Sequence, residues 1–127
     1  SILDQIEFVT GDICDRELMD KLVSETDVVV HFAAESHNDN SLRDPWPFLH
    51  TNLMGTATIL EAIRKHGKRL HHISTDEVYG SVETGMSTEH DCLAPRSPYS
   101  ASKAGGDLLA LSYWRLAMGE YGSSQGD

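Results

Sequence analysis

The sequence is short of cysteine, of long apolar runs and of basic residues, and each shortage excludes a class of protein. Cys14 and Cys92 stand too far apart for the paired spacing of a zinc site. We therefore expect two reduced thiols in a cytoplasmic protein, with no disulfide and no bound metal. No apolar run approaches the roughly 18 residues of a membrane span, and no targeting segment is visible, so we expect no membrane partner.

Basic residues are outnumbered, because ten Lys and Arg face twenty Asp and Glu, which gives a net charge of −10. A surface of this sign repels phosphate groups, so we expect no nucleic-acid partner. The 127 residues, 39% hydrophobic and 24% charged, are typical of one globular domain at most. An initiating Met is also missing, and we expect an internal fragment of a longer protein.

Apolar strands alternate with amphipathic helices along the chain. The patterns predict strands at 6–9, 28–34 and 70–74, a short helix capped by Asp15, and long helices at about 45–66 and 98–118. Polar segments at 35–43 and 75–96 are predicted loops at the carboxyl ends of strands. This order predicts an α/β fold, a doubly wound parallel sheet with helices on both faces.

Tyr99 and Lys103 stand four residues apart on the last predicted helix, so they share one face. A phenol is a poor base at neutral pH, but a fixed cation nearby stabilises its ionised form. The pair is therefore a candidate proton acceptor. The same spacing also arises on ordinary amphipathic helices, where it has only a structural role.

Two hydroxyl and two carboxyl side chains follow the third predicted strand, at Ser74, Thr75, Asp76 and Glu77. Ligands of doubly wound sheets bind outside the carboxyl ends of strands. One carboxyl kept protonated and one kept ionised would form an acid–base pair. The alternative is a solvated turn.

Five motifs, in this order along the chain, resemble extended short-chain dehydrogenases and within them the nucleotide-sugar 4,6-dehydratase family. The motifs are Gly11-Asp12-Ile13-Cys14-Asp15, Phe32-Ala33-Ala34-Glu35-Ser36-His37, Thr51-Asn52-Leu53-Met54-Gly55-Thr56, Thr75-Asp76-Glu77-Val78-Tyr79-Gly80 and Tyr99-Ser100-Ala101-Ser102-Lys103. The resemblance covers about residues 5–115, and the Thr75–Gly80 motif is its most specific part, because related sugar epimerases usually lack that acid pair.

The resemblance implies that residues 1–118 form a partial, Rossmann-like NAD-binding domain with strands three, four and five of the family. The glycine-rich first strand–helix unit of such domains is absent from the sequence. Strand 6–9 should therefore either pair abnormally or be poorly supported, since its neighbours in the family's sheet are missing. The Gly- and Ser-rich segment 119–127 is expected to be a disordered tail.

The resemblance also implies a catalytic cycle in which NAD is reduced and then regenerated. Tyr99 would remove the proton of the sugar 4-hydroxyl, Lys103 would hold the nicotinamide ribose, and Thr75 would stabilise charge on the 4-oxygen. Glu77 would remove the C5 proton, and Asp76 would protonate the departing 6-hydroxyl. These roles predict a lyase.

The remaining implied contacts concern the cofactor, the substrate and assembly. The cofactor would contact Asp12, Ile13, Phe32, Ala33, Ala34 and Thr51, and the sugar would contact Ser36 and Thr75. Asn38 stands where the family's loop usually has an apolar residue. The motifs favour dTDP- or UDP-glucose over GDP-mannose, and relatives usually form homodimers through the two long helices. The alternative is a binding module without catalysis, and the isolated chain is expected to be inactive.

Overall fold

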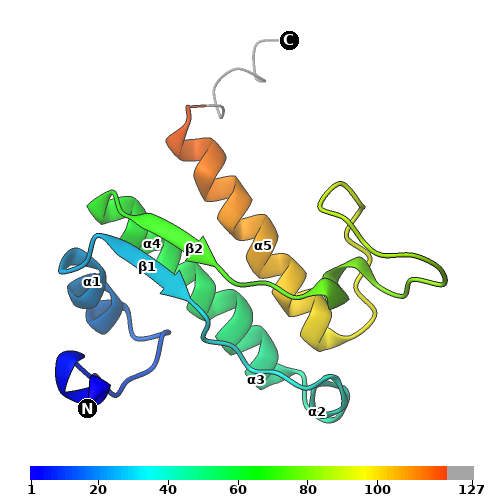
Figure 1. The fold of residues 1–127 in the computed structure, drawn as a ribbon, viewed down its shortest axis with the longest axis horizontal. Coiled ribbons are helices and arrows are strands. Elements are labelled where there is room, and N and C mark those ends of the chain that lie inside the picture. The colour runs from blue at the N-terminus through cyan, green and yellow to red at the C-terminus, as the bar shows by residue number, and fades with distance from the viewer. Residues whose placement is uncertain (120–127) are drawn as a thin grey trace.

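A computed structural model describes residues 1–119, which form a two-stranded parallel sheet with helices packed against it (Figure 1). The helices and strands, in chain order, are η1 (Ile2–Gln5), α1 (Arg16–Ser24), β1 (Val28–His31), α2 (Asn38–Arg43), α3 (Trp46–Leu49), η2 (His50–Gly55), α4 (Thr56–His66), β2 (Arg69–His72), η3 (Asp76–Tyr79) and α5 (Pro98–Ala117). The register pairs Val28 with Arg69 and His31 with His72. The two strands therefore end at the same edge of the sheet.

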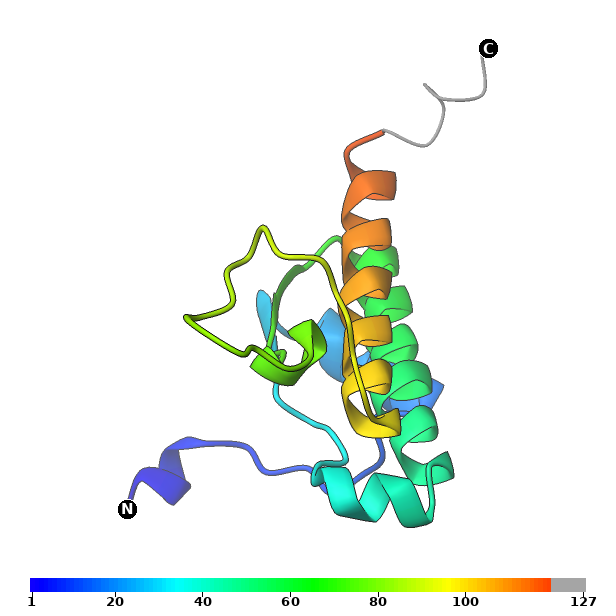
Figure 2. The same ribbon diagram turned by 90° about the vertical axis from the view of Figure 1, so that its right-hand side faces the viewer.

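The prediction that helices cover both faces of the sheet is wrong for the described residues. Figure 2 shows α4 and α5 together on one side of the strands, and α1 packs against α4 in the same layer. On β1, alternate side chains point away from this layer, so Val28 and Val30 are exposed, as is Phe32 just after the strand. The second face of a doubly wound sheet is covered by other strand–helix units, which these residues do not supply.

Residues 6–9 form no strand, which corrects the predicted three-stranded sheet. The segment is exposed throughout, and Phe8 has an exposed fraction of 84%. A strand needs a neighbour to pair with its backbone N–H and C=O groups. The described part of the chain places no strand beside residues 6–9, so their alternating apolar pattern is not sufficient to form one. The expectation that it would be poorly supported is confirmed.

The predicted helix ends are confirmed by their caps. Asp15 accepts a hydrogen bond from the backbone N–H of Leu18 at the start of α1. Ser97 and Ser100 form a capping box at the start of α5, where Pro98 occupies the first turn. Gly67, with φ 64°, ends α4 in the left-handed conformation that glycine adopts without strain.

The predicted helix at 45–66 is one continuous helical rod with a π-helical turn, η2, between α3 and α4. Gly55 lies in this turn, and a Cβ there would clash with the Cδ1 atom of Ile13. The missing side chain thus lets the turn before α1 pack closely against the rod. Such π turns occur frequently at functional sites, and the apolar periodicity of the sequence does not reveal this one.

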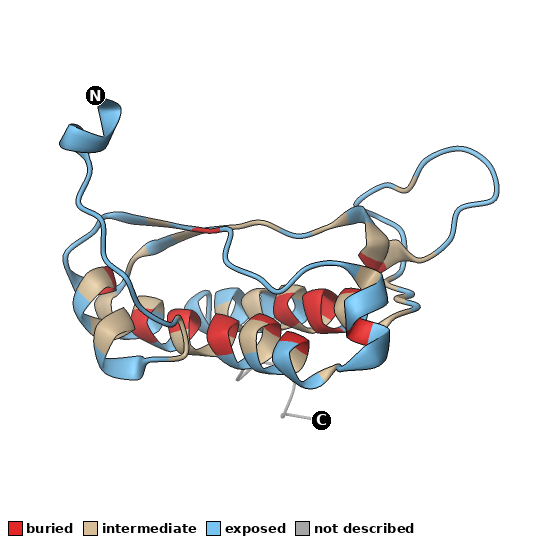
Figure 3. Cartoon of the chain, turned by 90° about the horizontal axis from the view of Figure 1, so that it is seen from below, coloured by how far each residue is buried: buried red, intermediate tan, exposed pale blue. Residues whose placement is uncertain are grey.

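The core lies between the sheet and the helix layer, as Figure 3 shows by its buried residues on the helices. Phe48, Ile59 and Leu60 are buried there. None of the described helices is long and apolar enough to cross a membrane. Of the predicted tail, Gly119 is described and follows α5 with φ 77°, whereas 120–127 lie outside the described residues.

The segment 35–43, predicted as a loop, contains the short helix α2. His37 precedes this helix with φ 80° and ψ 108°, and it is the non-glycine residue with a positive φ among those described. The helix begins at the next residue, Asn38, and packs against α5. Polar composition alone does not distinguish a short helix of this kind from a loop.

Candidate active site

The candidate site lies at the carboxyl edge of the sheet, where both strands end. His31 ends β1 and is followed by an exposed segment, 32–36, while His72 ends β2 and leads through Ile73 to Ser74 and Thr75. The first half of α5 packs beside this edge and contacts η3. The edge therefore combines two strand ends with one face of a helix, which is the usual ligand position in open α/β sheets.

Lys103 joins α5 to the end of β2. Its Nζ atom donates a hydrogen bond to the carbonyl oxygen of Ile73 at 2.8 Å. The side chain is buried, and burial lowers the pKa of Lys103, an effect that the negative charge of Asp107 opposes. An ammonium group has three N–H donors, so two of them remain for a ligand at the strand end.

Tyr99 lies one turn before Lys103 on α5. Its ring packs edge-on against Phe48 of α3, with ring centroids 6.1 Å apart. Its hydroxyl makes no hydrogen bond with any described residue. Phe48 is buried and packs against one side of the ring.

Thr75, Asp76 and Glu77 begin the 3-10 helix η3. Thr75 caps it, because its Oγ1 accepts from the backbone N–H of Glu77 at 3.3 Å and donates to Oδ1 of Asp76 at 3.4 Å. Asp76 is exposed, whereas Glu77 is half-buried and its Oε1 accepts from Nδ2 of Asn38 at 2.6 Å. The two neighbouring carboxyl groups thus have different environments, as an acid and a base in one site require.

Asn52 is a buried residue of the site that the sequence did not single out for a role. Its Oδ1 accepts from the backbone N–H of Glu35 at 2.9 Å, and its Nδ2 donates to the Glu35 carbonyl at 3.0 Å and to Oγ of Ser102 at 2.8 Å. These bonds connect the segment after β1 to the π turn and to α5. The sequence feature that could have indicated this role is the position of Asn52, a polar amide on the inward face of a predicted helix.

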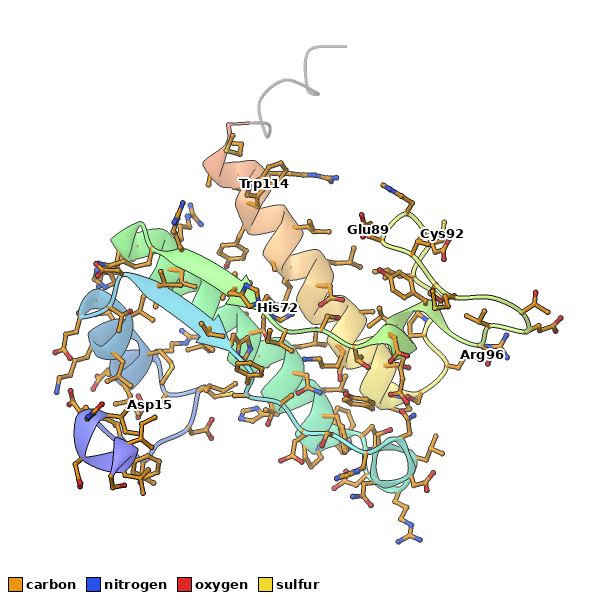
Figure 4. The ribbon with its side chains drawn as sticks, in the orientation of Figure 1. Asp15, His72, Glu89, Cys92, Arg96 and Trp114 are labelled. Atoms are coloured by element: carbon orange, nitrogen blue, oxygen red, sulfur yellow. The ribbon has the colours of Figure 1, made fainter. Side chains whose placement is uncertain are left out.

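A second polar cluster lies one turn further along α5. Asp107 accepts hydrogen bonds from Nε2 of His72, at 3.0 Å, and from Oγ of Ser74. Figure 4 shows His72 where β2 passes α5. His71 is exposed and His72 half-buried, as neighbouring residues of a strand that point to opposite faces. The described residues contain no group of three or more His, Cys, Asp or Glu that could hold a metal.

His31 is expected to make the chain sensitive to acid. Burial lowers its pKa to about 4, and the charges of His72 and Lys103 add to the effect. An unfolded histidine titrates near 6.5, so between pH about 6.5 and about 4 only the unfolded chain takes up this proton. The free energy of unfolding should therefore fall by about 3 kcal/mol as the pH decreases through this window.

Urea unfolding at about pH 7 and about pH 4 measures this loss. The variant His31→Gln keeps a polar partner for Thr56, which lies 3.0 Å from His31 Nε2, and should lose less stability in acid than the original chain. His90→Gln changes an exposed histidine and is the matched control. An equal acid loss in the original chain and in His31→Gln would contradict the assignment.

The other predicted contacts fall into two groups. Phe32, Ala33, Ala34 and Ser36 are exposed just beyond β1, and Thr51 is half-buried in the π turn. Asp12 Oδ1 accepts from the backbone N–H of Cys14 at 2.8 Å, and Ile13 packs at Gly55. The structure therefore brings the first group near the strand ends and gives the second a role in the turn before α1.

A groove of about 1380 Å³ runs along β2 and the second half of α5. It is lined mainly by apolar side chains and contains none of the five predicted catalytic residues, Thr75, Asp76, Glu77, Tyr99 and Lys103. The convergence of the Tyr99 hydroxyl with Thr75 stays a prediction. What the structure does show is the hydrogen bond from Lys103 to Ile73, two residues before Thr75.

A parallel strand–helix–strand unit with polar strand ends, followed by a helix that carries a Tyr–Lys pair, defines a partial Rossmann-like fold of the short-chain dehydrogenase type. Comparison with known proteins identifies the family within this class. The chain belongs to the GDP-mannose 4,6 dehydratase family, whose model matches residues 1–121.

Named relatives agree with this assignment. A dTDP-glucose 4,6-dehydratase of Mycobacterium tuberculosis is 60% identical over 115 residues, which are 88% of this chain and 35% of that protein. The crystal structure of DesIV, a dTDP-glucose 4,6-dehydratase from Streptomyces venezuelae with NAD and TYD bound, superimposes with a TM-score of 0.84 and 49% identity over 86% of this chain and 34% of that one. A UDP-glucose 4-epimerase from Brucella ovis in complex with NAD has a TM-score of 0.82 and 27% identity over 89% of this chain and 35% of that one. The chain thus spans about a third of the length of these proteins.

Proposed function

We propose that the chain is the central third of an NAD-dependent nucleotide-sugar 4,6-dehydratase, a lyase that converts dTDP-glucose to dTDP-4-keto-6-deoxyglucose. The observation that carries the proposal is the hydrogen bond from Lys103 to the Ile73 carbonyl, because it fixes the Tyr–Lys helix against the segment with Thr75, Asp76 and Glu77. The relatives named dTDP-glucose 4,6-dehydratase support the choice of reaction.

The residues present fit a nicotinamide cofactor. Phe32, Ala33 and Ala34 are exposed at the end of β1, where two small side chains leave room for a planar ring. Lys103 has N–H donors left for ribose hydroxyls, and Asp12 and Ile13 would meet the adenine end. When bound, NAD supplies the hydride acceptor that oxidises C4 of the sugar and later returns that hydride to C6.

Oxidation at C4 depends on Tyr99, Lys103 and Thr75. The phenolate of Tyr99 takes the proton of the sugar 4-hydroxyl, and the neighbouring ammonium of Lys103 stabilises that phenolate. The Thr75 hydroxyl turns from Asp76 toward the 4-oxygen and donates a hydrogen bond to it, while Ser36 contacts the sugar.

Elimination of water depends on the acid pair. The 4-keto group makes the C5 proton acidic, and the carboxylate of Glu77 removes it. Asp76, in its protonated form, gives a proton to the 6-hydroxyl, which leaves as water. Glu77 Oε1 accepts a hydrogen bond from Nδ2 of Asn38, as an ionised carboxylate does, and this contact supports its role as the base.

The parent protein acts in the cytoplasm as a homodimer formed through the faces of the long helices. Three apolar side chains of α5 support this contact, since Leu108, Leu111 and Trp114 are all at least half exposed (Trp114 is labelled in Figure 4). Both cysteines are free, as a reducing compartment would keep them.

The full-length parent, incubated with NAD and dTDP-glucose, should form a 4-keto-6-deoxy sugar, detected by its absorbance in alkali and by mass spectrometry as the loss of one water. UDP-glucose and GDP-mannose serve as parallel substrates and should react more slowly. Formation of the C4 epimer without loss of water would overturn the proposal, since that product defines an epimerase.

A further inference from the structure

A single side chain, Asn38, connects Glu77, the proposed C5 base, to the start of α5. Its Nδ2 donates to Oε1 of Glu77 at 2.6 Å, and its Oδ1 accepts from Oγ of Ser97 at 2.7 Å. Asn38 is 39 residues from Glu77 and 59 from Ser97 along the chain. All three side chains are half-buried, so the bridge is partly shielded from solvent.

The hydrogen bonds of this bridge all point toward Glu77. Ser97 Oγ accepts from the backbone N–H of Ser100 as the cap of α5, so its single proton goes to Asn38 Oδ1. The amide nitrogen of Asn38 can then only donate, and its acceptor is a carboxylate oxygen. The chain of donors begins at the N-terminus of a 20-residue helix, where the helix dipole favours negative charge.

The backbone just before Asn38 is strained. His37 has φ 80° and ψ 108°, a conformation that a non-glycine residue rarely adopts. The turn at His37 starts α2 at Asn38, and α2 packs against α5. Strain of this kind persists where the surrounding contacts fix the conformation, and it is concentrated at functional sites.

From these contacts we infer that Asn38 is a positioning residue for Glu77: it holds Oε1 and leaves Oε2 as the oxygen that takes the C5 proton. The inference rests on the proposed dehydratase function. Oε2 makes no hydrogen bond with any described residue, which is what a proton-accepting atom requires. A free carboxylate would rotate between rotamers, and the fixed one presents a single oxygen to the substrate.

Two substitutions in the full-length parent test the inference. Asn38→Leu has a similar size and removes both hydrogen bonds, and it should slow elimination roughly 10- to 100-fold while C4 oxidation changes less than about twofold. Asn38→Asp keeps an acceptor for Ser97 but places a second carboxylate beside that of Glu77. The repulsion favours the protonated form of the base, so elimination should also require a higher pH than in the original protein. Asn40→Leu changes the same residue type on α2, at an exposed position, and is the control.

Rapid mixing with dTDP-glucose separates the two steps, because reduced nicotinamide absorbs after oxidation and disappears when the turnover is completed. Accumulation of this absorbance in Asn38→Leu, with unchanged thermal unfolding, supports the inference. Equal slowing of both steps, or no slowing, would overturn it. A wild-type parent that forms no dehydrated product from dTDP-glucose would instead reject the proposed function.

A measurement on the 127-residue chain tests the bridge without activity. The side-chain amide protons of Asn38 should exchange with solvent more slowly than those of exposed Asn40 in ¹⁵N-resolved NMR spectra. Equal exchange of the two amides would show that the bridge is not formed, whatever the parent protein catalyses. Slow exchange together with unaltered kinetics in Asn38→Leu would reduce Asn38 to a structural role.

Discussion

Replacing Tyr99 with phenylalanine in the full-length parent is expected to lower the rate of C4 oxidation by about 10³-fold. The substitution removes one hydroxyl and keeps the ring, whose edge-on contact with Phe48 fixes its place beside α3. That hydroxyl makes no hydrogen bond with any described residue, so its loss leaves no buried group without a partner. Stability should be unchanged, and the measured loss should fall on the chemical step.

The reduced nicotinamide formed in a single turnover measures this step directly. Tyr113→Phe removes a hydroxyl from the same helix, where it donates to Oε1 of Glu61 at 2.8 Å, and should leave oxidation within about twofold. A Tyr99→Phe variant that oxidises the sugar at the original rate, or that loses only substrate affinity, would contradict the role assigned to the phenol.

The local features of the fold were predictable because they depend on neighbouring residues. Asp15 and Ser97 cap helices through contacts three residues away, and Gly67 ends α4 through its own backbone angle. Whether residues 6–9 form a strand could not be predicted from neighbouring residues. A strand exists only with a partner, and pairing depends on segments far apart in the sequence.

The candidate site was also predictable only where it depends on residues close together in the sequence. The spacing of Tyr99 and Lys103 placed both on one helix face, but the hydrogen bond from Lys103 to Ile73 spans 30 residues and follows from the packing of α5 on β2. Asn38 was noticed only as an unusual residue in its loop, since nothing in the sequence pairs it with Glu77. Its role emerges when α2, η3 and α5 are brought together.

Replacing Glu77 with glutamine should separate the two halves of the reaction. The new side chain keeps an oxygen that can accept the amide proton of Asn38, so the contact at 2.6 Å and the fold around η3 are retained. An amide cannot take the C5 proton, and elimination should slow by about 10²- to 10⁴-fold. Tyr99 and Lys103 are untouched, so oxidation at C4 should proceed.

The expected result is a burst of reduced nicotinamide that persists, with a sugar oxidised at C4 and still bearing its 6-hydroxyl. Exchange of the C5 proton with deuterated solvent should disappear together with elimination, because the same base governs both. Glu83→Gln, in the exposed loop after η3, is the matched control and should behave as the original protein. Persistent exchange at C5 in Glu77→Gln would assign the base to another residue, and Asn38 would then have no part in directing Oε2 of Glu77 toward the substrate.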